Sequence, residues 1–131
     1  MLNSAFRRAL IAGSVSLLLV STVLATADAT RTVTISSHIT IRGKGLTFSG
    51  NVTSSKAPCK RERKVTLYRT PALALGSTTT SSTGHWKITA SGSAGITLGH
   101  FYAKVKKRSE GTAGTIYVCK AATSRTIPYT P

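Results

Sequence analysis

Apolar side chains recur at every second position over most of the chain beyond residue 30, and this alternation restricts the fold more than any other feature. Successive side chains of a β-strand point to opposite faces, so an apolar set with period two indicates a half-buried strand. The apolar sets that share a face are Val33, Ile35, Ile39 and Ile41; Leu46, Phe48, Gly50 and Val52; Val65 and Leu67; Trp86, Ile88 and Ala90; Phe101, Ala103 and Val105; Ile116 and Val118. Beyond residue 29 no apolar set follows helical spacing over three turns, which predicts an all-β fold.

The runs are short, and residues typical of turns separate them. About seven strands in a chain of this length favour a single two-sheet β-sandwich. We expect Trp86 to anchor its core, because an indole buries more area than any other side chain here. Residues 77–82 hold threonines without an apolar face and predict an exposed edge strand or a loop. The last strand places Ile116 and Val118 on one face and Tyr117 and Cys119 on the other.

The first 29 residues have the order of a cleaved signal peptide. Arg7 and Arg8 precede an apolar stretch over residues 9–24, and small residues follow it. The stretch is shorter than the roughly 20 apolar residues of a membrane span, so no transmembrane anchor is expected after processing. We expect cleavage after Ala29, with Ala27 as the alternative, and either the general or the twin-arginine export route. The prediction is a secreted, extracellular protein with a sandwich domain over residues 30–131.

The chain is strongly basic, with 18 lysines and arginines against three acidic residues and a formal net charge of +15. Removal of residues 1–29 takes away Arg7, Arg8 and Asp28, so the charge falls by only one. Glu62 and Glu110 are then the only acidic side chains. Most cationic side chains must therefore stay unpaired and solvated, which keeps the protein soluble and attracts polyanions at low salt.

The two cysteines, Cys59 and Cys119, predict one disulfide, because an even pair in an exported chain is normally bonded. Two cysteines without C-x-x-C spacing do not form a closed zinc site. The histidines His38, His85 and His100 are not spaced as neighbours on one face and are interpreted as surface imidazoles. We therefore expect no metal and no cofactor.

The acidic residues bear on catalysis, because general acid-base chemistry needs a positioned proton acceptor. The expected mature chain has no aspartate for a Ser-His-Asp triad, and Glu62 and Glu110 lie among charged or turn residues and are expected to be exposed. The chain also has no G-x-S-x-G motif and no phosphate-binding glycine loop before a helix. The sequence therefore predicts that the protein is not an enzyme.

Four short segments follow one another in a familiar order. They are Phe48-Ser49-Gly50-Asn51-Val52, Arg63-Lys64-Val65-Thr66-Leu67-Tyr68-Arg69, Thr80-Ser81-Ser82-Thr83-Gly84-His85-Trp86 and Phe101-Tyr102-Ala103-Lys104-Val105. This order resembles the transthyretin-like, carboxypeptidase-regulatory-like modules of secreted bacterial proteins over residues 46–119. Ser81 stands where those modules usually carry an aspartate. The resemblance implies an immunoglobulin-like or transthyretin-like sandwich with an adhesive, carbohydrate-facing or spacer role, although a shared fold alone does not establish function.

The basic residues form clusters that we predict to contact anions as solvated cations. The candidates are Lys60, Arg61, Arg63, Lys64, Lys104, Lys106, Lys107 and Arg108. Tyr68 and Tyr102 are expected to add stacking. The predicted function is a monomeric, non-catalytic binding or structural module with affinity for an anionic cell-envelope polymer, and without dedicated nucleic-acid binding. Two alternatives stay open: the charge serves solubility alone, or the protein is a secreted inhibitor or effector that binds an acidic protein through residues 54–63 or 92–99.

Overall fold

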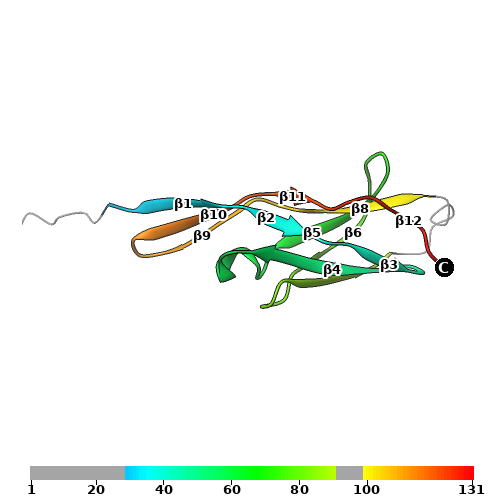
Figure 1. The fold of residues 1–131 in the computed structure, drawn as a ribbon, viewed down its shortest axis with the longest axis horizontal. Coiled ribbons are helices and arrows are strands. Elements are labelled where there is room, and N and C mark those ends of the chain that lie inside the picture. The colour runs from blue at the N-terminus through cyan, green and yellow to red at the C-terminus, as the bar shows by residue number, and fades with distance from the viewer. Residues whose placement is uncertain (1–28, 91–98) are drawn as a thin grey trace, which may run out of the picture.

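The computed structural model describes residues 29–90 and 99–131, which are almost entirely β-structure (Figure 1). The all-β prediction is confirmed. Within the described residues the segments are shorter and more numerous than the seven expected. They are β1 (Arg31–Ile35), β2 (Ser37–Ile39), β3 (Arg42–Lys44), β4 (Thr47–Ser54), the 3-10 turn η1 (Ala57–Cys59), β5 (Lys64–Arg69), β6 (Leu73–Thr79), β7 (His85–Thr89), β8 (His100–Val105), β9 (Arg108–Thr112), β10 (Thr115–Cys119), β11 (Ala122–Thr123) and β12 (Ile127–Pro128).

Two sheets enclose the main core. One has the order β11-β8-β5-β6, with β12 also paired to β8. The other joins β2, β3 and β7 to the long central strand β4. Residues 77–79 belong to the edge strand β6, as expected, and residues 80–82 follow it in a connection. Thr80 is buried rather than exposed. The two sheets form the sandwich.

The predicted apolar faces meet between the sheets. The buried cluster that joins them contains Ile39, Ile41, Phe48, Val52, Val65, Leu67, Trp86, Ile88, Ala90, Phe101, Ala103 and Val105. Trp86 is only 1% exposed, as its role as core anchor requires. Gly50 lies opposite it on β4, where a Cβ atom would clash with the carbonyl oxygen of Thr40. Only glycine therefore allows the main chain of residue 40 to approach β4 so closely.

A third sheet, β1-β10-β9, extends the molecule at one end (Figure 1). The run predicted as one strand over residues 32–41 breaks at Ser36, so β1 pairs with β10 in parallel and β2 crosses to β4. In β10 it is Tyr117 and Cys119 that pack inward, while Ile116 is 36% exposed. The strand length in this region is set by pairing partners that are far apart in sequence.

The predicted disulfide is confirmed and lies where the third sheet joins the sandwich. Cys59 at the end of η1 is bonded to Cys119 at the end of β10, and both are fully buried beside Ile35. The predicted signal peptide falls on residues 1–28 and Ala29, and all but Ala29 lies outside the described residues, as do residues 92–98 of one proposed partner loop. In the described part of the chain, no helix is long and apolar enough to cross a membrane.

Candidate anion-binding surface

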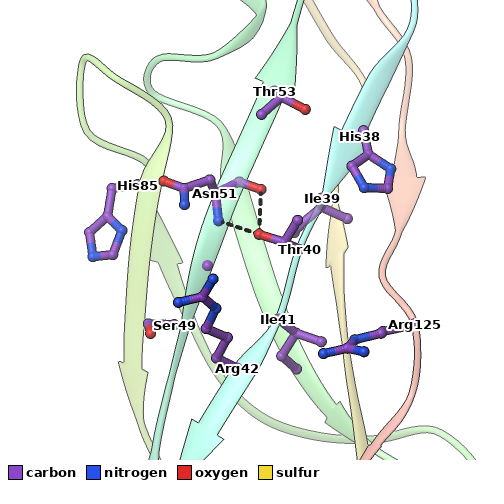
Figure 2. A pocket seen from close by; sticks show the side chains of 11 residues that line it. His38, Ile39, Thr40, Ile41, Arg42, Ser49, Asn51, Thr53, His85 and Arg125 are labelled. Atoms are coloured by element: carbon purple, nitrogen blue, oxygen red, sulfur yellow. Dashed lines mark hydrogen bonds between the residues drawn. The ribbon is translucent and has the colours of Figure 1, made fainter.

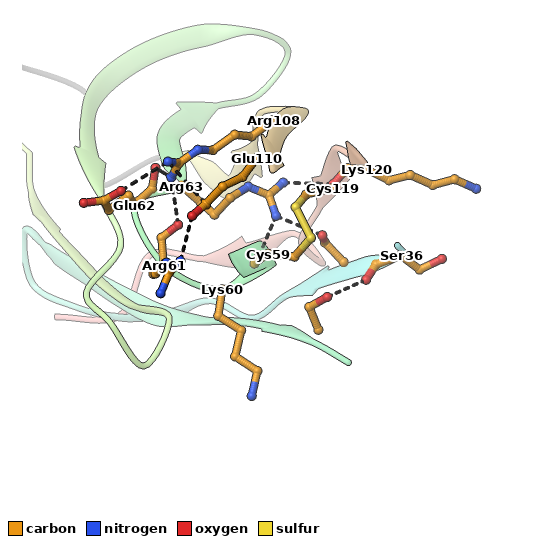
Figure 3. Close-up of a disulfide and its surroundings, with 12 residues drawn as sticks. Ser36, Cys59, Lys60, Arg61, Glu62, Arg63, Arg108, Glu110, Cys119 and Lys120 are labelled. Carbon is orange, nitrogen blue, oxygen red and sulfur yellow. Dashed lines mark hydrogen bonds and ion pairs between the residues drawn. A yellow bond between two sulfur atoms is a disulfide. The ribbon is translucent and has the colours of Figure 1, made fainter. Parts of the chain in front are cut away.

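Arg63 is not the solvated cation that the sequence predicted. Its side chain is fully buried at the junction of the three sheets (Figure 3). Nη1 donates to Ser37 Oγ at 3.0 Å and to the carbonyl of Cys59 at 2.6 Å, and Nη2 donates to the carbonyls of Lys106 at 2.7 Å and Lys120 at 2.9 Å. The prediction for this residue is therefore wrong, because the guanidinium is used to bind main-chain carbonyls of the protein itself.

The local reason for the position of Arg63 lies in the alternation of β5. Arg63 has the same parity as Val65 and Leu67, whose side chains are buried in the core. The side chain therefore points inward, where it meets carbonyl groups that strand pairing leaves free. Burial, with the positive charge of Arg108 as a smaller cause, lowers the pKa of the Arg63 guanidinium from its ordinary value.

Arg61 and Arg108 are engaged by the two glutamates (Figure 3). Arg61 Nη2 lies 2.7 Å from Glu110 Oε1. Arg108 Nη2 lies 3.1 Å from Glu62 Oε2 and 3.4 Å from Glu110 Oε2, and Arg108 Nη1 donates to the carbonyls of residues 61 and 62. These two arginines are thus poorly placed to act as free anion contacts.

The expectation that both glutamates are exposed holds only for Glu62, because the Glu110 side chain is 23% exposed. The hydrogen bond from Arg61 is the main cause that lowers the pKa of the Glu110 carboxyl. The same contact raises the pKa of Arg61. Glu110 is therefore held as a carboxylate in the folded protein.

Five of the predicted cations are lysines, and none of them has an ion pair among residues 29–90 and 99–131. Three of them lie together on the outer face of the first sheet. Lys104 on β8 lies beside Thr66 of β5, and the amide of Lys106 donates to the carbonyl of Lys64. Lys60 and Lys107 are the two others; Lys60 follows η1, and Lys107 lies between β8 and β9.

Two tyrosines support this group of lysines. Tyr68 and Tyr102 are paired across β5 and β8, with ring centroids 5.3 Å apart and planes inclined by 12°. Lys104 Nζ lies 5.5 Å from the Tyr68 centroid and 5.7 Å from the Tyr102 centroid, a cation–π arrangement. We call Lys64, Lys104 and Lys106 with this tyrosine pair the lysine face.

The tyrosines contribute differently from what the sequence predicted. Tyr102 is only 9% exposed, and its hydroxyl donates to the carbonyl of Pro71 at 2.8 Å. Its ring therefore stacks on Tyr68 and has little surface left for a ligand. The pair holds the Lys104 ammonium above the rings, where an exposed cation–π contact contributes about 0.5–1 kcal/mol.

Sequence reasoning gave little weight to two further arginines, Arg42 and Arg125. Both are exposed and line a hollow of about 490 Å³ on the second sheet, together with His38 and His85. The polar residues that alternate with apolar ones around Thr40 are the sequence pattern from which this surface could have been predicted. Among the described residues, no group of three or more His, Cys, Asp or Glu side chains has the arrangement of a metal site.

Comparisons with known proteins assign no function to this surface. No family model matches the chain, and no curated protein or solved structure matches it. The resemblance to transthyretin-like modules therefore stays a prediction, and the functional argument depends on the charges and contacts described above.

Proposed function

We propose that this protein is a secreted, monomeric, non-catalytic sandwich module of the transthyretin-like kind, which binds an anionic cell-envelope polymer through the lysine face. The observation that carries the proposal is the position of the Lys104 ammonium over the Tyr68 and Tyr102 rings, with the exposed Lys64 and Lys106 lying next to each other on the same sheet face. A group of unpaired cations on one sheet surface suits the repeated charges of a linear polyanion.

The distribution of the acidic residues supports the same proposal. Glu62 and Glu110 both pair with arginines, so neither neutralises a lysine of this face. The lysines are flexible donors whose charge stays in water, which favours electrostatic attraction over shape-specific recognition. Affinity is therefore expected to fall steeply as salt rises, because bound counterions are released from the polymer on binding.

The test compares two variants with equal loss of charge. In the first, Lys64, Lys104 and Lys106 are replaced by glutamine. In the control, three exposed lysines outside the lysine face are replaced instead, namely Lys44, Lys56 and Lys87. Retention of both variants and the original protein is measured on teichoic acid, heparin, DNA and a neutral polysaccharide across a salt series.

We expect the first variant to lose most of its retention at about 0.15 M salt, and the control to keep it. Equal losses in both variants would mean that net charge alone governs binding and would refute the lysine face. Weak binding of the original protein to every polyanion, lost by about 0.15 M salt, would reduce the charge to a solubility device. Salt-insensitive capture of an acidic protein would favour the inhibitor alternative.

A further inference from the structure

Three hollows follow one another along the edge formed by β2 and β3, with volumes of about 540, 490 and 350 Å³. The first and second share His38 and Thr53 as lining residues. The second and third share Ile41, Arg42 and Arg125. We call this series the edge groove. Because neighbouring hollows share lining residues, the series forms one continuous surface.

The polar side chains of the middle hollow come from three neighbouring strands in register (Figure 2). His38 of β2 is paired with Thr53 of β4, and Asn51 of β4 is paired with His85 of β7. The main-chain amide of Asn51 donates to the hydroxyl of Thr40 at 2.9 Å, and this hydroxyl donates back to the Asn51 carbonyl at 3.4 Å. The side-chain amide of Asn51, the second lone pair of the Thr40 hydroxyl and the two imidazoles can still form hydrogen bonds with a polar ligand.

Two arginines supply the charge of the edge groove. Figure 2 shows the Arg42 guanidinium directed toward Asn51, and Arg125 reaching from the segment between β11 and β12 toward Ile41. In the described residues neither guanidinium has an ion pair or a side-chain hydrogen bond, unlike Arg61. Each guanidinium can therefore donate two parallel hydrogen bonds to one acid group of a ligand.

The first hollow differs from the third in chemistry. It is lined largely by hydroxyl side chains, namely Thr34, Ser36, Ser37, Thr53, Ser54 and Ser55. No carboxylate lines any of the three hollows among the described residues. Hydroxyl donors at one end and free guanidinium groups at the other match a ligand that carries many hydroxyls together with acid groups.

We propose that the edge groove binds a short acidic oligosaccharide, whose carboxylates meet Arg42 and Arg125 and whose hydroxyls meet Thr40, Asn51 and the serine-rich end. The groove belongs to the β2–β3 side of the second sheet, whereas the lysine face lies on β5 and β8 of the first. The edge groove is therefore a second site, independent of the polymer binding proposed above.

The test removes the lysine face first, so that the two proposals fail separately. Protein with the disulfide intact and glutamine at positions 64, 104 and 106 is titrated with tetragalacturonate, and backbone amide shifts are followed by NMR. We expect the shifts to concentrate at Thr40, Asn51 and their strand neighbours, and maltotetraose, which has no acid group, to bind at least fivefold more weakly. R42Q and R125Q are each expected to weaken tetragalacturonate binding at least fivefold.

R31Q is the matched control, because Arg31 is exposed on β1 and lines none of the three hollows. Equal affinity of R31Q and R42Q would refute the site. Tetraglutamate, a peptide with several carboxylates, tests the ligand class, and binding as tight as that of the uronate would overturn the assignment to a sugar. Shifts spread over the whole surface would also overturn it. An unchanged spectrum of each free variant establishes that its fold is intact.

Discussion

Replacement of Arg63 by methionine removes the guanidinium while a side chain of similar reach stays in the junction. Four hydrogen bonds are lost, to Ser37 Oγ and to the carbonyls of Cys59, Lys106 and Lys120. Hydrogen bonds from a charged donor contribute about 1.5–3 kcal/mol each, a net value that already includes the water lost by donor and acceptor, and bonds made by one group do not add in full. Methionine leaves the buried Cys59 carbonyl without a partner, which costs about 1–3 kcal/mol, while the three part-buried acceptors regain some contact with water. We therefore expect a loss of about 2–4 kcal/mol in the free energy of unfolding.

Urea unfolding followed by tryptophan fluorescence measures this loss directly, because Trp86 is the only tryptophan and is 1% exposed in the folded protein. The control is Arg31→Met, an exposed position where a change within about 0.5 kcal/mol is expected. If Arg63→Met changes the free energy of unfolding by less than about 0.5 kcal/mol, the guanidinium is not a net stabilising group. A more stable variant would show that dehydration outweighs the four hydrogen bonds.

Three other changes test the framework around these sites. Replacing Cys59 and Cys119 by serine opens a loop with a sequence separation of 60 and should lower stability by up to about 4 kcal/mol, whereas a midpoint in urea equal to the original would contradict this. The lowered pKa of Glu110 stabilises the fold above about pH 4.5, its ordinary value, and this contribution disappears as pH falls through the folded-state value. Glu110→Gln should therefore be less stable than the original protein at pH 7. Between pH 7 and pH 3 its free energy of unfolding should fall by less than that of the original protein, and parallel curves of stability against pH would argue against the ion pair. Gly50→Ala places a Cβ atom in a clash with the Thr40 carbonyl oxygen, so a loss of about 1–3 kcal/mol is expected in the same urea assay, and unchanged stability would mean that the strand shifts freely.

Part of the candidate site could be predicted from the sequence because it depends on alternation alone. The placement of Lys104 on the polar face of β8, and of Lys106 directly after this strand, follows from the period of two, and both are exposed. The support that Tyr68 gives to Lys104 could not be predicted, since it requires β5 to lie beside β8 in one particular register. The pairing of Arg61 with Glu110 could not be predicted either, because the two residues lie far apart in the chain.

The all-β class, the buried apolar faces and the disulfide could be predicted from the sequence, because side-chain direction in a strand is local and only two cysteines exist to pair. Which cations remain free depends on the three-dimensional arrangement of the strands. Arg63 shares the inward parity of Val65, yet a charged side chain stays in the core only when acceptors surround it. Its acceptors come from β2, η1 and the segments after β8 and β10. Apart from η1, whose Cys59 is four residues from Arg63, these segments are distant in sequence, so only folding brings their oxygen atoms within reach of one guanidinium.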